Sequence, residues 1–429
     1  MKEIDLSRQP MSGHQILMVV ICFILNFSDG IDVLIVSFSS SEIIAEWGLS
    51  KVEMGYVFSS GLAGMTLGCF LIAPLADKIG RRKIFLISIS MITLGMFGVG
   101  LSHDFLLMLG LRFLTGLGIG GILPTMTATA AEFSNQKYRD FNVGLVQAGW
   151  PVGAIVIGFV CARFIPIYGW HFAFIIAGCF SFATLLLVYF FMTDSLEFLL
   201  KNQSEGSLQK VNKLMKKMNL LALEVLPKMD QNMKETSVKS LFTPEFKDST
   251  IKAWIAAFFG FLTLYTLMSW VPGIAKDAGL SFQLAALVGI TLNVGAALGS
   301  ASIGAIGSKF GLRQSQLTFM LFAFTVMLVY AFSSLTVVLI FILILLIGIF
   351  VQGGFNGIWP ILSRIYPAEI RATGVGFTVG VGRFGAILGP LLFGYLVDFG
   401  LPIQVLFIIF SIPLLIMGIS IWSLKSSRL

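Results

Sequence analysis

Long apolar blocks separated by short polar segments run along this chain of 429 residues. A helix that crosses the hydrocarbon core of a bilayer needs about 20 apolar residues. The blocks predict twelve such spans, at 15–38, 53–75, 83–101, 105–130, 141–163, 171–192, 252–272, 283–306, 315–332, 335–362, 373–397 and 402–423. Only Ser333, Ser334 and Thr336 separate the ninth span from the tenth. No small-residue cleavage site follows the first block, so we expect it to be a retained span.

The composition agrees with an all-α membrane protein. Hydrophobic residues make up 56% of the chain and charged residues only 12%, whereas soluble domains contain about 25% charged residues. The net charge of +7 does not indicate a nucleic-acid partner, because the basic residues lie at the ends of spans, where membrane topology explains them. We therefore expect the bilayer, and no nucleic acid, around this chain.

The basic residues also predict the orientation. With the N-terminus inside, the outer loops contain only Lys51, Arg163 and Lys276, and Arg112 and Arg383 lie within spans. The cytoplasmic segments then hold the other 24 of the 29 Lys and Arg. Basic flanks resist translocation, so we expect both termini in the cytoplasm and the protein in the inner membrane of a bacterial cell.

One long polar interval divides the chain. It predicts an N-terminal six-helix half at 1–192, a cytoplasmic linker at 193–250 and a C-terminal six-helix half at 251–429. A segment such as 208–226 could form an amphipathic helix on the membrane surface, although a solvated linker is the plainer interpretation. The four cysteines lie in apolar stretches without CxxC or metal-binding spacing, so we expect no metal and no cofactor.

A loop motif occurs twice, at the same place in each half. The first copy follows span 2 as Ala73-Pro-Leu-Ala-Asp77-Lys-Ile-Gly80-Arg81-Arg82-Lys83, and the second follows span 8 as Gly304-Ala-Ile-Gly-Ser308-Lys-Phe-Gly311-Leu-Arg313. In the first copy Gly80 permits a tight turn, and Asp77 at a helix end can pair with Arg81, Arg82 or a neighbouring helix N-terminus. Two matched copies indicate duplicated halves related by an axis along the membrane normal.

With these loops the chain resembles the major facilitator superfamily over essentially its whole length. The supporting segments are Arg112-Phe-Leu-Thr-Gly116-Leu-Gly-Ile-Gly120 in span 4 and 366–374, which follows span 10. Glycines four residues apart allow helices to approach closely. Two positions depart from the family's loop motif: Ala73 replaces its first glycine and Ser308 its acid in the second copy. The second departure implies that the C-terminal half lacks a carboxylate lock.

Two acids inside span 1 are candidates for proton coupling. Asp29 and Asp32 lie three residues apart, on one helix face. An ionisable residue within a span costs at least about 2.5–3.5 kcal/mol, and two neighbouring, partly desolvated acids raise the proton affinity of at least one of them. A proton-coupled carrier needs such a group, which binds H+ on one side of the membrane and releases it on the other. Structural pairing is the alternative interpretation.

The Asp-Gly-x-Asp signature makes the resemblance narrower, since it is similar to that of the aromatic acid:proton symporters, which include 4-hydroxybenzoate, benzoate and muconate permeases. This resemblance implies corresponding charged residues at Asp29, Asp32, Asp77, Arg112, Glu132, Arg371 and Arg383. The chain departs from some family members by having no histidine after His171.

Further candidates fall into two groups. Arg383, deep in span 11, is expected to anchor a substrate carboxylate, or to pair with the span-1 acids in the unloaded state. Arg112 lies near enough to the outer end of span 4 to extend toward the interface. The other residues expected to line the substrate site are Gln147, Gln352 and Asn356, with Trp150, Tyr265, Trp270, Asn293 and Trp359 as weaker candidates. The residues expected to form gates or locks are Asp77, Gly80, Arg81, Arg82, Glu132, Arg139, Glu369 and Arg371.

These features predict a secondary transporter that works as a monomer, imports a small organic anion and uses the proton gradient. The expected partners are H+ and a carboxylate such as benzoate, hydroxybenzoate or muconate. A nicotinate-type nutrient remains open, as does proton-coupled efflux, because Gly385–Pro390 resembles an antiporter motif, although in span 11 and not in span 5. The nucleotide-binding pattern GxxxxGK[ST] does not occur, which argues against ATP-driven transport. The linker is too short and polar for a sensor's signalling domain.

Overall fold

The computed structural model describes residues 10–201, 206–226, 238–334 and 336–424, and these residues are almost all helical. Among them, twelve helical stretches are long and apolar enough to cross a membrane. The long helices are α1 (Gly13–Trp47), α2 (Lys51–Leu71), α4 (Arg81–Leu101), α5 (Phe105–Phe133), α6 (Arg139–Tyr168), α7 (Trp170–Phe191), α10 (Lys247–Asp277), α11 (Phe282–Phe310), α12 (Leu312–Phe332), α13 (Val337–Asn356), α15 (Ala368–Asp398) and α16 (Ile403–Trp422). The twelve predicted spans are therefore confirmed.

The tenth predicted span differs in one respect, because it is divided into α13 and α14 (Ile358–Ile365) at Gly357. Pro360 has no amide hydrogen to donate to the carbonyl of Asn356, so the regular ladder is interrupted there. Several helices are also longer than predicted; α1, for example, continues through a serine-rich stretch to Trp47.

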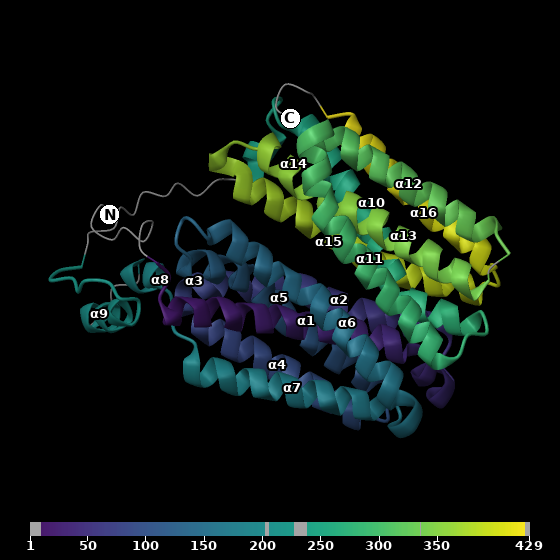
Figure 1. Ribbon diagram of the computed structural model, residues 1–429, viewed down its shortest axis with the longest axis horizontal. Coiled ribbons are helices and arrows are strands. Elements are labelled where there is room, and N and C mark those ends of the chain that lie inside the picture. The colour runs from purple at the N-terminus through teal and green to yellow at the C-terminus, as the bar shows by residue number, and fades with distance from the viewer. Residues whose placement is uncertain (1–9, 202–205, 227–237, 335, 425–429) are drawn as a thin grey trace. The chain divides into compact units, whose positions relative to one another are not determined.

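The helices, which are labelled in Figure 1, form two compact units. Unit 1 contains Met1–Val33, Gly64–Gly153 and Phe174–Lys234, and unit 2 contains Leu34–Ala63, Ala154–Ala173 and Glu235–Leu429. The divisions fall inside α1, α2, α6 and α7. One end of each of these helices is thus grouped with the C-terminal helices. The boundaries predicted from the sequence, 1–192, 193–250 and 251–429, describe the repeated halves and not these two units. They stay a prediction.

The same kind of close glycine contact occurs within each unit. In unit 1 α2 approaches α5 so closely that a Cβ at Gly64 would overlap the carbonyl oxygen of Phe113. In unit 2 α11 packs extensively on α13, where a Cβ at Gly299 would overlap the carbonyl oxygen of Ile349. Small residues at such crossings let backbones approach. These two helix pairs occupy equivalent places in the two halves, as a duplication requires.

A second repeated contact concerns the glycines near the antiporter-like segment. A Cβ at Gly153 of α6 would overlap the carbonyl oxygen of Phe27 in α1, and a Cβ at Gly385 of α15 would overlap that of Phe258 in α10. In each half the fifth long helix therefore packs on the first through glycine. The Gly385–Pro390 segment thus has a helix-packing role that requires no antiport function.

Short helices connect the long ones: η1 (Ala73–Leu75), α3 (Ala76–Ile79), α8 (Leu196–Lys201), α9 (Ser207–Lys217) and η2 (Val238–Phe242). Helix α9 is the amphipathic helix that we gave as the alternative to a solvated linker, over part of the expected range: it buries Val211, Leu214 and Met215 and exposes its four lysines. Its position on a membrane surface stays a prediction. The helix ends earlier than predicted, and Asn219 follows with a φ of 59°. The rest of the linker includes 202–205 and 227–237, which lie outside the described residues.

Candidate functional site

The two copies of the loop motif have the same turn. Gly80 precedes α4 with φ 103° and ψ 148°, and Gly311 precedes α12 with φ 87° and ψ 136°. Residues with a side chain rarely adopt this conformation, so glycine is needed at both positions. A shared and unusual backbone geometry at matching places supports the duplication more strongly than sequence similarity alone.

In the first copy, Arg81 links the loop to α5. Its guanidinium lies 3.2 Å from the carboxylate of Asp77 and 2.6 Å from that of Glu132. Asp77 is mostly exposed, whereas the Arg81 and Glu132 side chains are largely buried. A charge-assisted hydrogen bond is stronger where water is excluded. The Arg81–Glu132 pair is therefore the firmer of the two, and the predicted pairing of Asp77 with Arg81 is confirmed.

The next arginine of the first copy, Arg82, and its counterpart Arg313 in the second copy make similar contacts. Arg82 donates to the carbonyl oxygen of Tyr189 at 2.6 Å and lies over that residue's ring. Arg313 donates to the carbonyl oxygen of Leu424 and lies over the ring of Trp422. Each arginine thus ties the loop to the end of the last long helix of its half.

The two copies differ at the residue before this arginine. Leu312 occupies the place that Arg81 has in the first copy. Ser308 donates only to the carbonyl oxygen of Ala305 in its own helix. Leucine and serine side chains carry no charge, so these two positions cannot repeat the ion pairs of the first copy, and the lack of a carboxylate lock in the C-terminal half stays a prediction.

Two residues in these regions were missed by the sequence analysis. Asp194, just after α7, accepts a hydrogen bond from the amide of Arg82 at 3.0 Å and so caps the start of α4. Tyr366 is buried, and its hydroxyl donates to Thr250 at 3.1 Å; burial raises the pKa of this phenol. The Thr193-Asp194-Ser195 segment signals a cap for the helix that follows it, and Ser195 does accept from the amide of Phe198 in α8. Nothing in the sequence indicated that Asp194 caps α4, or that Tyr366 bonds to Thr250.

The other predicted gate residues lie at helix starts. Arg139 is the first residue of α6, and Arg371 in the first turns of α15 donates to the carbonyl oxygen of Tyr366 at 3.3 Å. Glu369 is in the same helix, but its side chain lies outside the described residues. The gating roles of all three stay predictions.

In unit 1 the structure brings two predicted site residues together inside the span region. Arg112 of α5 donates to a carboxylate oxygen of Asp32 in α1 at 2.8 Å and to the Asp32 carbonyl at 3.2 Å. The side chains are 6% and 0% exposed. Arg112 therefore does not extend to the interface, and Asp29, also buried, lies one turn away. Removing one partner of such a buried pair costs about 3–5 kcal/mol.

In unit 2 Arg383 of α15 is held by aromatic side chains of α10. Its guanidinium donates to the hydroxyl of Tyr265 at 3.0 Å and lies 5.4 Å and 5.7 Å from the ring centroids of Phe261 and Tyr265. These two rings, one helical turn apart, are nearly parallel, with an interplanar angle of 11°. Cation–π attraction and the hydrogen bond together orient the guanidinium.

The predicted polar residues form two small networks. In unit 2 Gln352 and Asn356 of α13 are joined at 3.3 Å, and Asn356 donates to Ser300 of α11 at 2.7 Å. In unit 1 Gln147, which is exposed, donates to Thr127 of α5 at 3.0 Å. Trp270 is buried and donates to the carbonyl oxygen of Pro390, which favours a packing role. No group of His, Cys, Asp or Glu able to hold a metal occurs within the described ranges.

A further set of contacts, which we call the α2 latch, was not predicted. Both oxygens of Asp398, the last residue of α15, accept from backbone amides at the start of α2: Lys51 at 3.1 Å and Val52 at 2.8 Å. The Lys51 ammonium lies 2.6 Å from Asp277 at the end of α10. Tyr56 and Tyr395 are joined at 2.8 Å. These residues lie at the helix ends predicted to be extracellular, all within unit 2.

Ser37 extends these contacts to α1 by donating to the carbonyl oxygens of Met268 and Ser269 at 2.7 Å and 2.8 Å. The serine-rich end of α1 is thus held against α10.

Comparison with known proteins agrees with this architecture. Residues 21–360 and 253–428 match the model of the Major Facilitator Superfamily. The gallate transporter of Pseudomonas putida is 27% identical over 436 residues, covering 99% of this chain and 95% of that protein. The 4-hydroxybenzoate transporter PcaK of Acinetobacter baylyi is 30% identical over 398 residues, covering 89% and 84%. The chain is also similar to the inward open xylose transporter XylE from E. coli (TM-score 0.74, 17% identity, 96% and 98% covered).

The family model covers nearly the whole chain, and these relatives are named as transporters and not as enzymes. The fold, the repeated loop and the relatives lead to the same assignment: this chain belongs to the Major Facilitator Superfamily and is a multi-pass membrane transport protein.

Proposed function

We propose that this protein is a proton-coupled symporter that imports a small aromatic or dienoic carboxylate, of the benzoate, hydroxybenzoate or muconate type. The observation that carries this proposal is the buried ion pair between Asp32 and Arg112, 2.8 Å apart and almost fully shielded from solvent. The names of the gallate and 4-hydroxybenzoate transporters support the substrate class.

The ion pair supplies a physical reason for coupling. Protonation of Asp32 cancels its charge and leaves the Arg112 guanidinium buried without its counter-ion, which costs several kcal/mol. A substrate carboxylate that takes the place of Asp32 removes this cost. The net charge of the site is then the same before and after one proton and one carboxylate have entered. Proton and anion therefore stabilise each other's binding, which is the requirement for symport.

Arg383 is the second residue proposed to bind the substrate. A guanidinium matches a carboxylate with two parallel hydrogen bonds, and the rings of Phe261 and Tyr265 beside it offer faces on which a planar substrate can pack. We assign Gln352, Asn356 and Gln147 to contacts with other parts of the substrate. A nicotinate-type acid has the same carboxylate and ring, so it belongs among the test substrates.

The proposed cycle uses the two sets of polar contacts as alternating gates. The α2 latch would close the outer side, and the Arg81–Glu132 pair with its loop would act on the cytoplasmic side. The loop motif and both termini are cytoplasmic in this proposal, the membrane is the bacterial inner membrane, and the monomer is the functional unit.

Uptake by purified protein in proteoliposomes tests the proposal. With an acidic exterior, labelled 4-hydroxybenzoate, muconate or nicotinate should accumulate, and a protonophore should abolish the accumulation. Asp32→Asn, which mimics the protonated acid, should lose accumulation but retain exchange of substrate across the membrane. Asp248→Asn is the matched control, because Asp248 pairs only at the exposed end of α10 with Lys252, and it should transport normally.

A stability measurement separates coupling from misfolding. Since Asp32→Asn leaves Arg112 without its carboxylate, substrate should raise the melting temperature of this variant more than that of the wild type. Uptake that is the same with and without the proton gradient would rule out proton symport. Full accumulation by Asp32→Asn would remove Asp32 from the coupling mechanism, and export against the gradient would favour efflux instead.

A further inference from the structure

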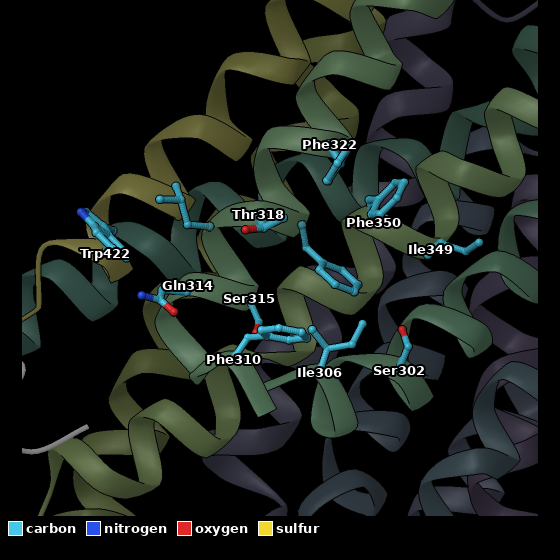
Figure 2. Close-up of a pocket in the computed structure, with 12 residues that line it drawn as sticks. Ser302, Ile306, Phe310, Gln314, Ser315, Thr318, Phe322, Ile349, Phe350 and Trp422 are labelled. Atoms are coloured by element: carbon cyan, nitrogen blue, oxygen red, sulfur yellow. The ribbon is translucent and has the colours of Figure 1, made fainter. Parts of the chain in front are cut away.

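A groove opens on the surface of unit 2, and its lining includes none of the residues proposed to bind substrate or protons. It has a volume of about 780 Å³ and is lined by α11, α12, α13 and α16. Figure 2 shows the aromatic and aliphatic side chains of Phe310, Ile306, Phe322, Phe350 and Trp422 around this hollow. The volume lies within the range of about 300–1,000 Å³ that is typical of sites for small molecules.

The groove runs from the end of a helix into the span region. Phe310 and Trp422 are the last residues of α11 and α16, and Gln314 is in the first turn of α12, so this end lies beside the Gly311 turn. The groove continues along α12 to Phe322, eight residues or about 12 Å farther. There the rings of Phe322 and Phe350 stack with centroids 5.1 Å apart. This length and lining suit an extended hydrocarbon chain.

The side chains around the groove are exposed although they are apolar. Phe310 is 60% exposed and Phe322 51%, while the buried Ser315 and Phe319 lie at the bottom. Four spanning helices form the walls, so the medium that meets these rings is the lipid bilayer. An acyl chain that fills a groove of this kind makes van der Waals contacts with lining side chains that would otherwise lack neighbours.

The charged residues near the groove indicate which type of lipid would bind there. No Asp or Glu occurs from residue 278 to residue 368, a stretch that contains α11, α12 and α13. Two basic residues lie at the helix-end opening: Lys309 is over the ring of Phe310 at 5.4 Å, and Arg313 is over the ring of Trp422 at 5.6 Å. Basic residues at the ends of membrane helices attract anionic headgroups.

We propose that this groove, the lipid groove, binds one anionic phospholipid of the phosphatidylglycerol type. An acyl chain lies along Ile306, Phe322 and Phe350, and the headgroup phosphate lies near Lys309 and Arg313. The inference is independent of the transported substrate, because it concerns a face of α11, α12, α13 and α16 that includes none of the proposed transport residues.

Native mass spectrometry of the full chain in detergent tests it, with phosphatidylglycerol and phosphatidylethanolamine of identical acyl chains as probes. The wild type should prefer phosphatidylglycerol. Each basic residue near a headgroup contributes about fivefold in affinity, so Lys309→Gln should weaken phosphatidylglycerol binding about fivefold and Lys309→Gln with Arg313→Gln roughly thirtyfold. Lys247→Gln, a basic residue at the exposed start of α10, should leave the preference intact.

A second variant tests the groove itself. Thr318 is an exposed residue of the lining, so Thr318→Trp should fill the space without changing the core and should reduce the binding of both lipids. Equal binding of the two lipids by the wild type would overturn the proposal, as would unchanged binding by Thr318→Trp. If the groove joins two copies of the chain instead, dimers will appear and Thr318→Trp will abolish them while the lipid binding stays as it was.

Discussion

Asp398→Ala is expected to shift the transporter toward the state in which α2 has left α15. The two carboxylate oxygens of Asp398 accept hydrogen bonds from the amides of Lys51 and Val52, which begin α2. The first four amides of a helix have no acceptor within it. Asp398 thus caps a helix that belongs to a distant part of the sequence, and the bond must break when the two helices separate.

The magnitude follows from the capping geometry. Loss of a side-chain cap costs about 0.5–2 kcal/mol. The Lys51–Asp277 pair remains in the variant and, with side chains 21% and 44% exposed, contributes at most about 1 kcal/mol. A loss of about 1–2 kcal/mol that affects only the latched state multiplies the ratio of unlatched to latched molecules by roughly 5–30.

Thiol labelling measures this ratio. Ser40 is buried where α1 faces Gly273 of α10, and its hydroxyl donates to the carbonyl oxygen of Ser37 in the same helix at 2.8 Å. Ser40→Cys, in a variant without the four native cysteines, should react with a membrane-impermeant maleimide only after the latch opens. Asp398→Ala should increase the labelling rate roughly 5–30-fold.

Glu53→Ala provides the matched control. Glu53 and Ser50 form a capping box at the same end of α2, with Glu53 accepting from the Ser50 amide at 2.8 Å and Ser50 accepting from the Glu53 amide at 3.1 Å. This cap lies within one helix and does not cross to α15. If Glu53→Ala accelerates labelling as much as Asp398→Ala, the effect is a loss of helix stability and the latch interpretation is wrong. An unchanged rate in Asp398→Ala would refute it as well.

Three further outcomes are expected. Gly64→Ala should lower the free energy of unfolding by about 1–3 kcal/mol because the new methyl overlaps a carbonyl of α5, whereas Gly110→Ala, with nothing within 4 Å, should not; denaturation in detergent measures both. Glu132→Gln should weaken the bond to Arg81 and lower thermal stability by about 1–3 kcal/mol, and an unchanged melting temperature would contradict a buried lock. Tyr265→Phe keeps the ring but removes one hydrogen bond, so KM for a carboxylate should rise about fivefold at constant Vmax, and an equal loss for a neutral analogue would indicate a structural role.

Local patterns in the sequence were sufficient for the spans and the repeat. Apolar length alone placed the twelve spans, because a bilayer imposes one length on every crossing helix. The repeated Gly80 and Gly311 turns were also recognisable, since glycine is needed at a positive φ. The Asp77–Arg81 pair was predictable because the two residues lie only four positions apart, on either side of the Gly80 turn.

Long-range contacts were not predictable in this way. Asp32 and Arg112 were both recognised as unusual, but the sequence analysis named Arg383 as the partner of the span-1 acids. The structure instead pairs Asp32 with Arg112, 80 positions away, which local sequence does not indicate. Asp398 lies at a helix end like many exposed acids, and nothing near it in the sequence indicates that it caps α2. The contacts of Arg383 with the rings of Phe261 and Tyr265 depend on the packing of α15 on α10, which hydropathy does not specify.

The cap on α2 has a consequence for biosynthesis. Lys51 and its acceptor Asp398 are 347 positions apart, and a ribosome adds about 5–20 residues per second. The start of α2 therefore waits about 17–70 s after its own synthesis for the residue that completes its hydrogen bonds. During that time the first helices must stay in the bilayer with this end hydrated. A six-helix fragment expressed alone would never receive the cap, so we expect its ends on this side to fray.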